Sequence, residues 1–242
     1  MLNSPTYGLF MLLALIVFVV SRHFQEKPEA IKKLHWMDRL ILGLAALVGG
    51  AFGAKIPFVI AGDQNWWVPQ AWLSDGKTIT TGLLGAYVGV EIAKWILKIR
   101  ARTGDTFAIP LALALAIGRW GCFFHGCCYG AATSLPWGVN FGDGVLRHPT
   151  QLYEVLFHFS MGMFCWWLIR RGYLKTHRLK LYLICYGIYR FATEYLRPEP
   201  RDYVGLTLYQ WIAIVLIVSL SLQWFYHAWQ AQPKGAAQSQ FA

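Results

Sequence analysis

Charged side chains are scarce in this sequence. Only 12 of its 242 residues are acidic, and all charged residues together make up 14 % of the chain. Soluble domains average about 25 % charged residues, which they need to cover their surface. Because 56 % of the residues are hydrophobic, the chain has more apolar surface than one core of this size can bury. Much of that surface is therefore expected to face lipid.

Internal repeats and long polar linkers are also missing, apart from the C-terminal segment GAAQSQFA. We therefore expect a single domain over residues 1–242. The first apolar stretch lacks the basic start and the small-residue cleavage pattern of a signal peptide, so we expect it to be retained as a membrane span.

The apolar residues occur in runs that are long enough to cross a bilayer. A spanning helix needs about 20 residues, and seven runs come close to that length. The expected fold class is thus all-α, a polytopic membrane protein of about seven transmembrane helices. The spans lie near residues 7–22, 39–62, 78–99, 105–124, 151–169, 179–196 and 206–228.

Basic residues collect in alternate connections between these spans. The connections near residues 22–39, 98–102 and 170–180 are rich in Lys and Arg, whereas the second connection, residues 62–77, has only Lys77. The positive-inside rule places the basic connections in the cytoplasm, with the N-terminus outside and the C-terminus cytoplasmic. The net charge of +10 lies in these short loops, so we expect anionic lipid headgroups and not nucleic acid as its partner.

Four ionisable residues fall near the outer ends of the expected spans: Arg119, Glu154, Arg190 and Glu194. Ionisable groups are costly inside a bilayer and mark functional sites. A mixed cluster of cations and anions at this depth fits the head of an anionic phospholipid. For Arg190 and Glu194 a simpler interpretation also holds, an ion pair four residues apart that supports one helix.

The segment GRWGCFFHGCCYG, residues 118–130, holds Cys122, His125, Cys127 and Cys128. Four interpretations remain open. The cluster is a soft-metal site, a thiolate nucleophile activated by His125, an oxidised pair, or packing in a glycine-rich turn. The spacing matches no standard metal motif, and adjacent cysteines do not easily bind one ion. We therefore expect no resident metal and no cofactor.

Glycine recurs in this segment at positions 118, 121, 126 and 130. This density predicts irregular backbone, which survives at membrane depth only where protein or a wet cavity covers it. Free backbone amides beside Arg119 would then form a cradle for a phosphate group.

Three ordered segments resemble the prolipoprotein diacylglyceryl transferase family. GRWGCFFHGCCYG is similar to the family signature G-R-x-G-N-F-x-N-x-E-x-x-G, and HPTQLYE is similar to its HPSQLYE segment. YRFATEYLRPEP and LTLYQW are similar to its G-R-F-x-x-E-x-x-R and L-x-x-G-Q segments. The resemblance extends from the third expected span to the seventh.

This resemblance implies an enzyme of the bacterial cytoplasmic (inner) membrane whose active site faces the outer leaflet. Such enzymes move the diacylglyceryl group of phosphatidylglycerol to the lipobox cysteine thiol of a prolipoprotein, whose signal peptide is a partner, and release glycerol phosphate. The resemblance maps essential residues onto Arg119, Arg190 and Glu194, and we take Glu194 as the candidate base. His125 is the candidate to replace the catalytic histidine that the family has and this chain lacks. Expected substrate-binding residues are Arg119, Gly121, Cys122, Tyr153, Glu154, Arg197 and Gln210.

The chain departs from the family pattern at four polar positions. Cys122 and His125 stand where the signature has asparagine, Cys127 stands where it has glutamate, and Thr80 stands where the family has a histidine. Two classes of function follow. One is an enzyme that uses an anionic glycerophospholipid, with the lipobox cysteine or another group as acceptor. The other is an accessory protein that binds phospholipid without transfer. The retained arginines and glutamates favour the enzyme.

Overall fold

The computed structural model describes residues 4–26, 28–61, 72 and 78–230. The expected end of the second span at residue 62, nearly all of the second connection and the C-terminal segment after residue 230 lie outside this description. Predictions about the charge of that connection therefore rest on the sequence alone.

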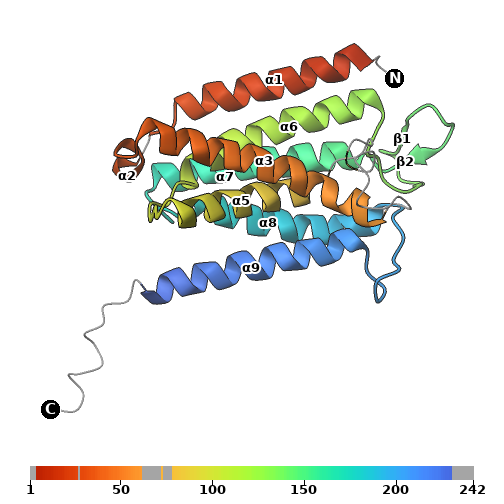
Figure 1. Ribbon diagram of the computed structural model, residues 1–242. Helices are drawn as coiled ribbons and strands as arrows, with labels where there is room; N and C mark the ends of the chain where they lie inside the picture. Colours follow the sequence, from red (N-terminus) through yellow and green to blue (C-terminus); the bar gives the residue numbers. More distant parts are fainter. Residues whose placement is uncertain (1–3, 27, 62–71, 73–77, 231–242) are drawn as a thin grey trace.

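Long helices dominate the described part of the chain (Figure 1). Each matches one expected span to within a few residues, because the apolar runs that predict the spans also favour continuous helix. They are α1 (Ser4–His23), α3 (Trp36–Ala61), α5 (Ile79–Ile96), α6 (Ala108–His125), α7 (Thr150–Arg170), α8 (Arg178–Thr193) and α9 (Leu208–Gln230). Shorter helical pieces are α2 (Glu29–Lys32), η1 (Asp105–Phe107) and η2 (Glu194–Leu196).

Five helices within the described ranges are long and apolar enough to cross a membrane: α1, α3, α6 (with η1), α7 and α9. Many of their large apolar side chains are exposed, such as Leu47 of α3 and Phe225 of α9, at 70 % and 71 %. Exposed apolar surface on this scale is stable in lipid and not in water. The protein is therefore a mostly helical, multi-pass membrane protein.

A small hairpin departs from the all-α expectation. Strands β1 (Val139–Asn140) and β2 (Leu146–Arg147) pair antiparallel, with Val139 opposite Arg147. The Asn140 side chain accepts hydrogen bonds from the backbone N–H groups of Gly142 and Gly144, at 2.8 and 3.1 Å. Strands of two residues carry no alternating pattern, so the sequence does not predict them. The hairpin lies beyond the end of α6 and the start of α7 (Figure 1).

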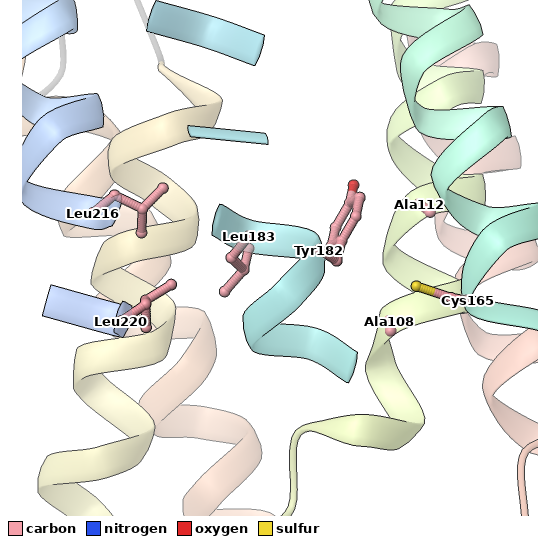
Figure 2. Close-up of a cluster of buried hydrophobic side chains, with 7 residues drawn as sticks. All are labelled: Ala108, Ala112, Cys165, Tyr182, Leu183, Leu216 and Leu220. Carbon is pink, nitrogen blue, oxygen red and sulfur yellow. The ribbon is translucent and has the colours of Figure 1, made fainter. Parts of the chain in front are cut away.

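The buried core joins α8 to the helices on either side of it (Figure 2). Tyr182 of α8 points toward Ala112 of α6 and Cys165 of α7, whereas Leu183 points toward Leu216 and Leu220 of α9. Cys165 is fully buried, as expected for a lone cysteine in an apolar span. Helix α8 is thus held from both sides, and this packing fixes the position of the residues near its end.

Helices α3 and α5 pack with their backbones in close approach. A Cβ atom added to Gly49 would collide with the carbonyl oxygen of Gly85, and one added to Gly85 would collide with that of Gly49. Small residues at such crossings allow helices to associate in lipid, where the hydrophobic effect does not drive association. This pair also carries Thr80, at the start of α5, toward the candidate site.

Candidate active site

Glu154, near the start of α7, is the centre of a buried ionic network. Its side chain is 1 % exposed and accepts hydrogen bonds from three arginines. The Nε of Arg119 on α6 lies at 2.5 Å, an Nη of Arg190 on α8 at 3.3 Å and an Nη of Arg197, after η2, at 3.0 Å. A buried carboxylate needs such partners to offset its loss of hydration. The network therefore brings together four residues that the sequence analysis selected.

Glu194 extends this network through Arg190. A second Nη of Arg190 donates to Glu194 at 2.7 Å, so the expected pair four residues apart is present. The Thr207 hydroxyl donates to the other Glu194 oxygen at 3.4 Å. Arg190 thus bridges the two carboxylates, and the simple helix-supporting interpretation of the pair is incomplete.

Gln210 supports the network indirectly, through Thr207. Its side-chain oxygen accepts a hydrogen bond from the Thr207 backbone N–H at 3.0 Å, and the Gln210 N–H donates to the Thr207 hydroxyl oxygen at 3.1 Å. These reciprocal bonds form a capping box at the start of α9. Gln210 therefore positions Thr207, which contacts Glu194.

Two further residues, Tyr186 and His158, adjoin Glu154 and were missed by the sequence analysis. The Tyr186 hydroxyl lies 3.5 Å from a Glu154 oxygen and is close to the Thr80 side chain. His158 is fully buried, and its Nδ1 is 2.9 Å from the Tyr182 hydroxyl. His158 follows Glu154 by four residues and Tyr186 precedes Arg190 by four, so helical spacing was the available signal.

The expectation of irregular backbone around Arg119 is wrong up to residue 125. Helix α6 continues through Gly118 and Gly121 to His125, and it ends at Gly126 in a left-handed conformation (φ 75°). A Cβ at Gly121 would lie 2.7 Å from the Cβ of Phe10 on α1, so this glycine permits close helix packing. The proposed phosphate cradle of glycine amides is therefore not formed by Gly121.

The turn after α6 gathers three cysteines. The sulfur atoms of Cys122, Cys127 and Cys128 all lie within 4.8 Å of one another, and the three thiols are free. Cys128 has a left-handed backbone (φ 63°), which changes the direction of its side chain relative to that of Cys127. Cys127 and Cys128 thus direct their sulfur atoms to the same place although they are adjacent in the sequence.

Helix α7 holds this turn in place beside the arginines. Gln151 donates to the Cys127 carbonyl at 2.6 Å, and the Thr150 hydroxyl donates to the Cys128 carbonyl at 2.9 Å. Hydrogen bonds from Cys122 and Cys127, and then the charges of Arg119 and Arg197, lower the pKa of the Cys128 thiol. The cysteine cluster and the arginine network are therefore electrostatic neighbours.

His125 and Tyr153 lie at the edge of this region. The His125 ring packs against Tyr7 with centroids 5.2 Å apart, and its buried Nδ1 has no hydrogen-bond partner within the described residues. The Tyr153 hydroxyl accepts a hydrogen bond from the Trp137 indole at 2.8 Å and lies 3.3 Å from Nδ1 of His148. These contacts direct Tyr153 toward the hairpin and His125 toward α1.

Comparison with known proteins agrees with the motifs. Residues 2–226 match the family model described as prolipoprotein diacylglyceryl transferase. A phosphatidylglycerol–prolipoprotein diacylglyceryl transferase of Clostridium tetani is 30 % identical over 227 residues, which cover 88 % of each chain. The enzyme so named from Cupriavidus necator is 29 % identical, over 97 % of this chain and 91 % of its own, and that of Coxiella burnetii is 32 % identical, over 80 % and 81 %. The chain therefore belongs to the prolipoprotein diacylglyceryl transferase family.

Proposed function

We propose that this protein transfers the diacylglyceryl group of phosphatidylglycerol to the cysteine thiol of a prolipoprotein and releases glycerol phosphate. The observation that carries this proposal is the convergence of Arg119, Arg190 and Arg197 on buried Glu154, at the ends of membrane-type helices. The names of the bacterial relatives support the donor and the acceptor.

The arginines are suited to the phosphate of the lipid head. Guanidinium groups bind phosphate oxygens through paired, charge-assisted hydrogen bonds. The Nε of Arg197 is buried and has no hydrogen-bond partner in the described part of the chain, so it is a donor available to a ligand. We assign Arg119 and Arg190 to stabilise the charge that develops on the departing phosphate, and Glu154 to hold the three side chains in place.

The acceptor thiol must lose its proton before it attacks. Glu194 is our candidate base, because its carboxylate borders Arg190 and is oriented by Thr207. The thiolate sulfur then attacks the glycerol carbon that bears the phosphate. The carbon–oxygen bond breaks, and its electron pair leaves with glycerol phosphate. His125, whose Nδ1 has no partner among the described residues, is the second candidate for this proton.

The other expected substrate-binding residues have separate roles in this proposal. Cys122 follows Arg119 by three residues on the same face of α6 and borders the phosphate. Gly121 allows α1 to pack closely against α6 next to this site. Tyr153 and its exposed partner Trp137 form the edge that meets the signal peptide of the prolipoprotein. Gln210 acts through Thr207.

We also propose a single domain of seven spans with the N-terminus outside and the C-terminus in the cytoplasm. Helices α5 and α8, of 18 and 16 residues, lie alongside the five helices that are long and apolar enough to cross a membrane. The start of α1 and the end of α9 lie at opposite ends of the bundle, which supports an odd number of crossings (Figure 1). The arginine network lies at the end where α1 begins, which this orientation places toward the outer leaflet of the cytoplasmic membrane. A reporter fused to the C-terminus tests this topology, and an outside C-terminus would contradict it.

The decisive assay measures release of glycerol phosphate from labelled phosphatidylglycerol by the full-length protein in nanodiscs, with and without a lipobox peptide. We expect release that requires both the peptide and Arg190, with Arg170→Ala as the matched control from a basic connection. Release without the peptide would keep the lipid donor and assign another acceptor. Lipid binding without release would instead indicate a phospholipid-binding accessory protein.

A further inference from the structure

The cysteine cluster has the composition of a soft-metal site. Cys122 comes from the last turn of α6, and Cys127 and Cys128 follow the left-handed residue Gly126. Cys122 is buried, Cys127 is half-buried and Cys128 is exposed, so the cluster opens on one side. Thiolates are the ligands that zinc and other soft ions prefer.

We propose that Cys122, Cys127 and Cys128 bind one zinc-like soft divalent ion whose fourth position receives the acceptor thiol. The first half of this proposal, the metal site, stands on the geometry of the cluster alone. The second half rests on the proposed transferase function.

The distances between the sulfur atoms fit such an ion. Zinc–sulfur bonds of about 2.3 Å in a tetrahedron place the sulfurs about 3.8 Å apart. The three sulfurs lie within 4.8 Å of one another. Binding therefore requires movements of about 1 Å or less, which rotation of the side chains supplies.

The backbone that presents the sulfurs is already fixed. Gln151 and Thr150 of α7 bind the carbonyl oxygens of Cys127 and Cys128. Cys128 adopts a left-handed conformation (φ 63°) that is unfavourable for a residue with a Cβ and persists only where its surroundings impose it. The turn is thus held in the shape that brings two adjacent sulfurs together, and such supporting contacts typically strengthen metal affinity.

The charges around the cysteine cluster also suit a bound divalent ion. Three thiolates and a divalent ion leave one negative charge in excess. The positive charges of Arg119 and Arg197 lie near Cys128, so they reduce the free-energy cost of that excess charge. The same arginines are assigned to the lipid phosphate, which places the fourth metal position beside the donor.

A metal at this point would activate the acceptor thiol. Coordination favours the thiolate form of a bound thiol, and its proton passes to Glu194. The metal-bound sulfur would then attack the glycerol carbon. The bond from that carbon to the phosphate oxygen would break, and the oxygen would leave with the electron pair. Glu194 would finally return the thiol proton to the departing phosphate. No oxidant or reductant is required. Thr80, which adjoins Tyr186 in the network, stands where the family has a histidine, and its hydroxyl cannot serve as the base.

The metal site is tested without any activity assay. Full-length protein in nanodiscs is stripped with chelator, titrated with Zn²⁺ and analysed for metal content, with alkylation and mass spectrometry to verify free thiols. We expect one ion per chain, and loss of binding in Cys122→Ser, Cys127→Ser and Cys128→Ser. The matched control Cys185→Ser, a half-buried cysteine of α8, retains the ion. A wild-type protein that binds no ion, or serine variants that keep it, would overturn the proposal.

The open position is tested with Co²⁺ in place of Zn²⁺. We expect a lipobox peptide to add a fourth sulfur-to-cobalt charge-transfer contribution to the absorption spectrum, and the same peptide with serine for cysteine to add none. An unchanged spectrum would overturn the acceptor role. Arg190-dependent transfer that persists after complete metal removal would also overturn it while leaving the proposed transferase function intact. Absence of transfer with or without metal, in a protein that binds the ion, would contradict the transferase function and leave the metal site standing.

Discussion

Both ends of the pair α6 and α8 carry buried charge, and the two ends are built differently. At the start of these helices, the Asp105 carboxylate accepts hydrogen bonds from the backbone N–H groups of Thr176 and Arg178, at 2.6 and 2.8 Å, and from the Arg178 guanidinium at 3.3 Å. At the other end, Glu154 meets three guanidiniums and no backbone donor that the structure describes. A carboxylate satisfied by backbone anchors a loop. We propose that a carboxylate surrounded by cations with unused hydrogen-bond donors belongs to a binding site for an anion.

The largest expected effect comes from removing the charge of each carboxylate while keeping its shape. Glu154→Gln leaves three buried guanidiniums without their anion, and we expect it to lower the free energy of unfolding by about 3–5 kcal/mol and to abolish transfer. SDS titration followed by circular dichroism measures the stability. Asp105→Asn, the control at the other end, should lose about 1–3 kcal/mol and keep its activity per folded molecule. Equal loss of activity in both variants would contradict the claim that Glu154 belongs to the active site and Asp105 only to the structure.

Removing one arginine from each end should separate catalysis from structure. Arg119→Ala deletes a donor aimed at the developing phosphate charge, so we expect kcat to fall by about 10²–10³-fold. Arg102→Ala removes a guanidinium that contacts Thr176 and His177 at the opposite end, at 2.9 and 3.2 Å, and should leave kcat unchanged. Steady-state release of glycerol phosphate measures both. A comparable fall in kcat for Arg102→Ala would contradict our assignment of Arg119 to the departing phosphate.

Replacing an arginine by lysine, which keeps the positive charge, should also distinguish the two ends. Arg197→Lys keeps the positive charge but loses the unpartnered Nε and the planar fork, so we expect the KM for phosphatidylglycerol to rise about tenfold, the equivalent of one charge-assisted hydrogen bond. Arg178→Lys loses the contact of its Nε with the Tyr173 carbonyl, at 3.0 Å, and should lower stability without altering KM. An unchanged KM in Arg197→Lys would remove Arg197 from the phosphate site.

The smallest expected effect concerns the capping box of α9. Gln210→Ala removes one of its two reciprocal hydrogen bonds and should cost about 1 kcal/mol of stability. Because Thr207 then orients Glu194 less well, we also expect a small fall in kcat. Gln230→Ala, at the exposed far end of the same helix, should change neither quantity. A fall in lipid affinity with normal stability would instead indicate that Gln210 contacts the lipid directly.

The long helices were predictable from the sequence because a membrane imposes one requirement on each apolar segment separately. The run expected at 151–169 is α7, Thr150–Arg170, and the run expected at 105–124 begins at η1 and ends with α6 at His125. Hydropathy depends on composition within one segment, so no knowledge of neighbouring helices was needed. The two-residue strands of the hairpin fall below the length at which any pattern can be read.

The candidate site was predictable only as a set of residues. Charges inside apolar spans selected Arg119, Glu154, Arg190 and Glu194, and the structure brings these four together. Their order around Glu154 depends on how α6, α7 and α8 pack, which spacing within one helix does not encode. The left-handed backbone of Cys128 is likewise imposed by the contacts of Thr150 and Gln151, and cysteine carries no preference for it.

The composition of the arginine network also bears on how the reaction ends. Three guanidiniums face two carboxylates, Glu154 and Glu194, so this buried group of side chains carries an uncancelled positive charge. The single negative charge of a phosphodiester lipid would bring the site to neutrality. Transfer leaves the thiol proton on Glu194 and a second negative charge on the phosphate monoester of glycerol phosphate, so the site stays neutral at first. Once that proton passes to water, the two carboxylates and the doubly charged product exceed the three guanidiniums, and the balance turns repulsive. The excess of one arginine over the carboxylates, which favours binding of the lipid substrate, would thus also favour release of the product into water.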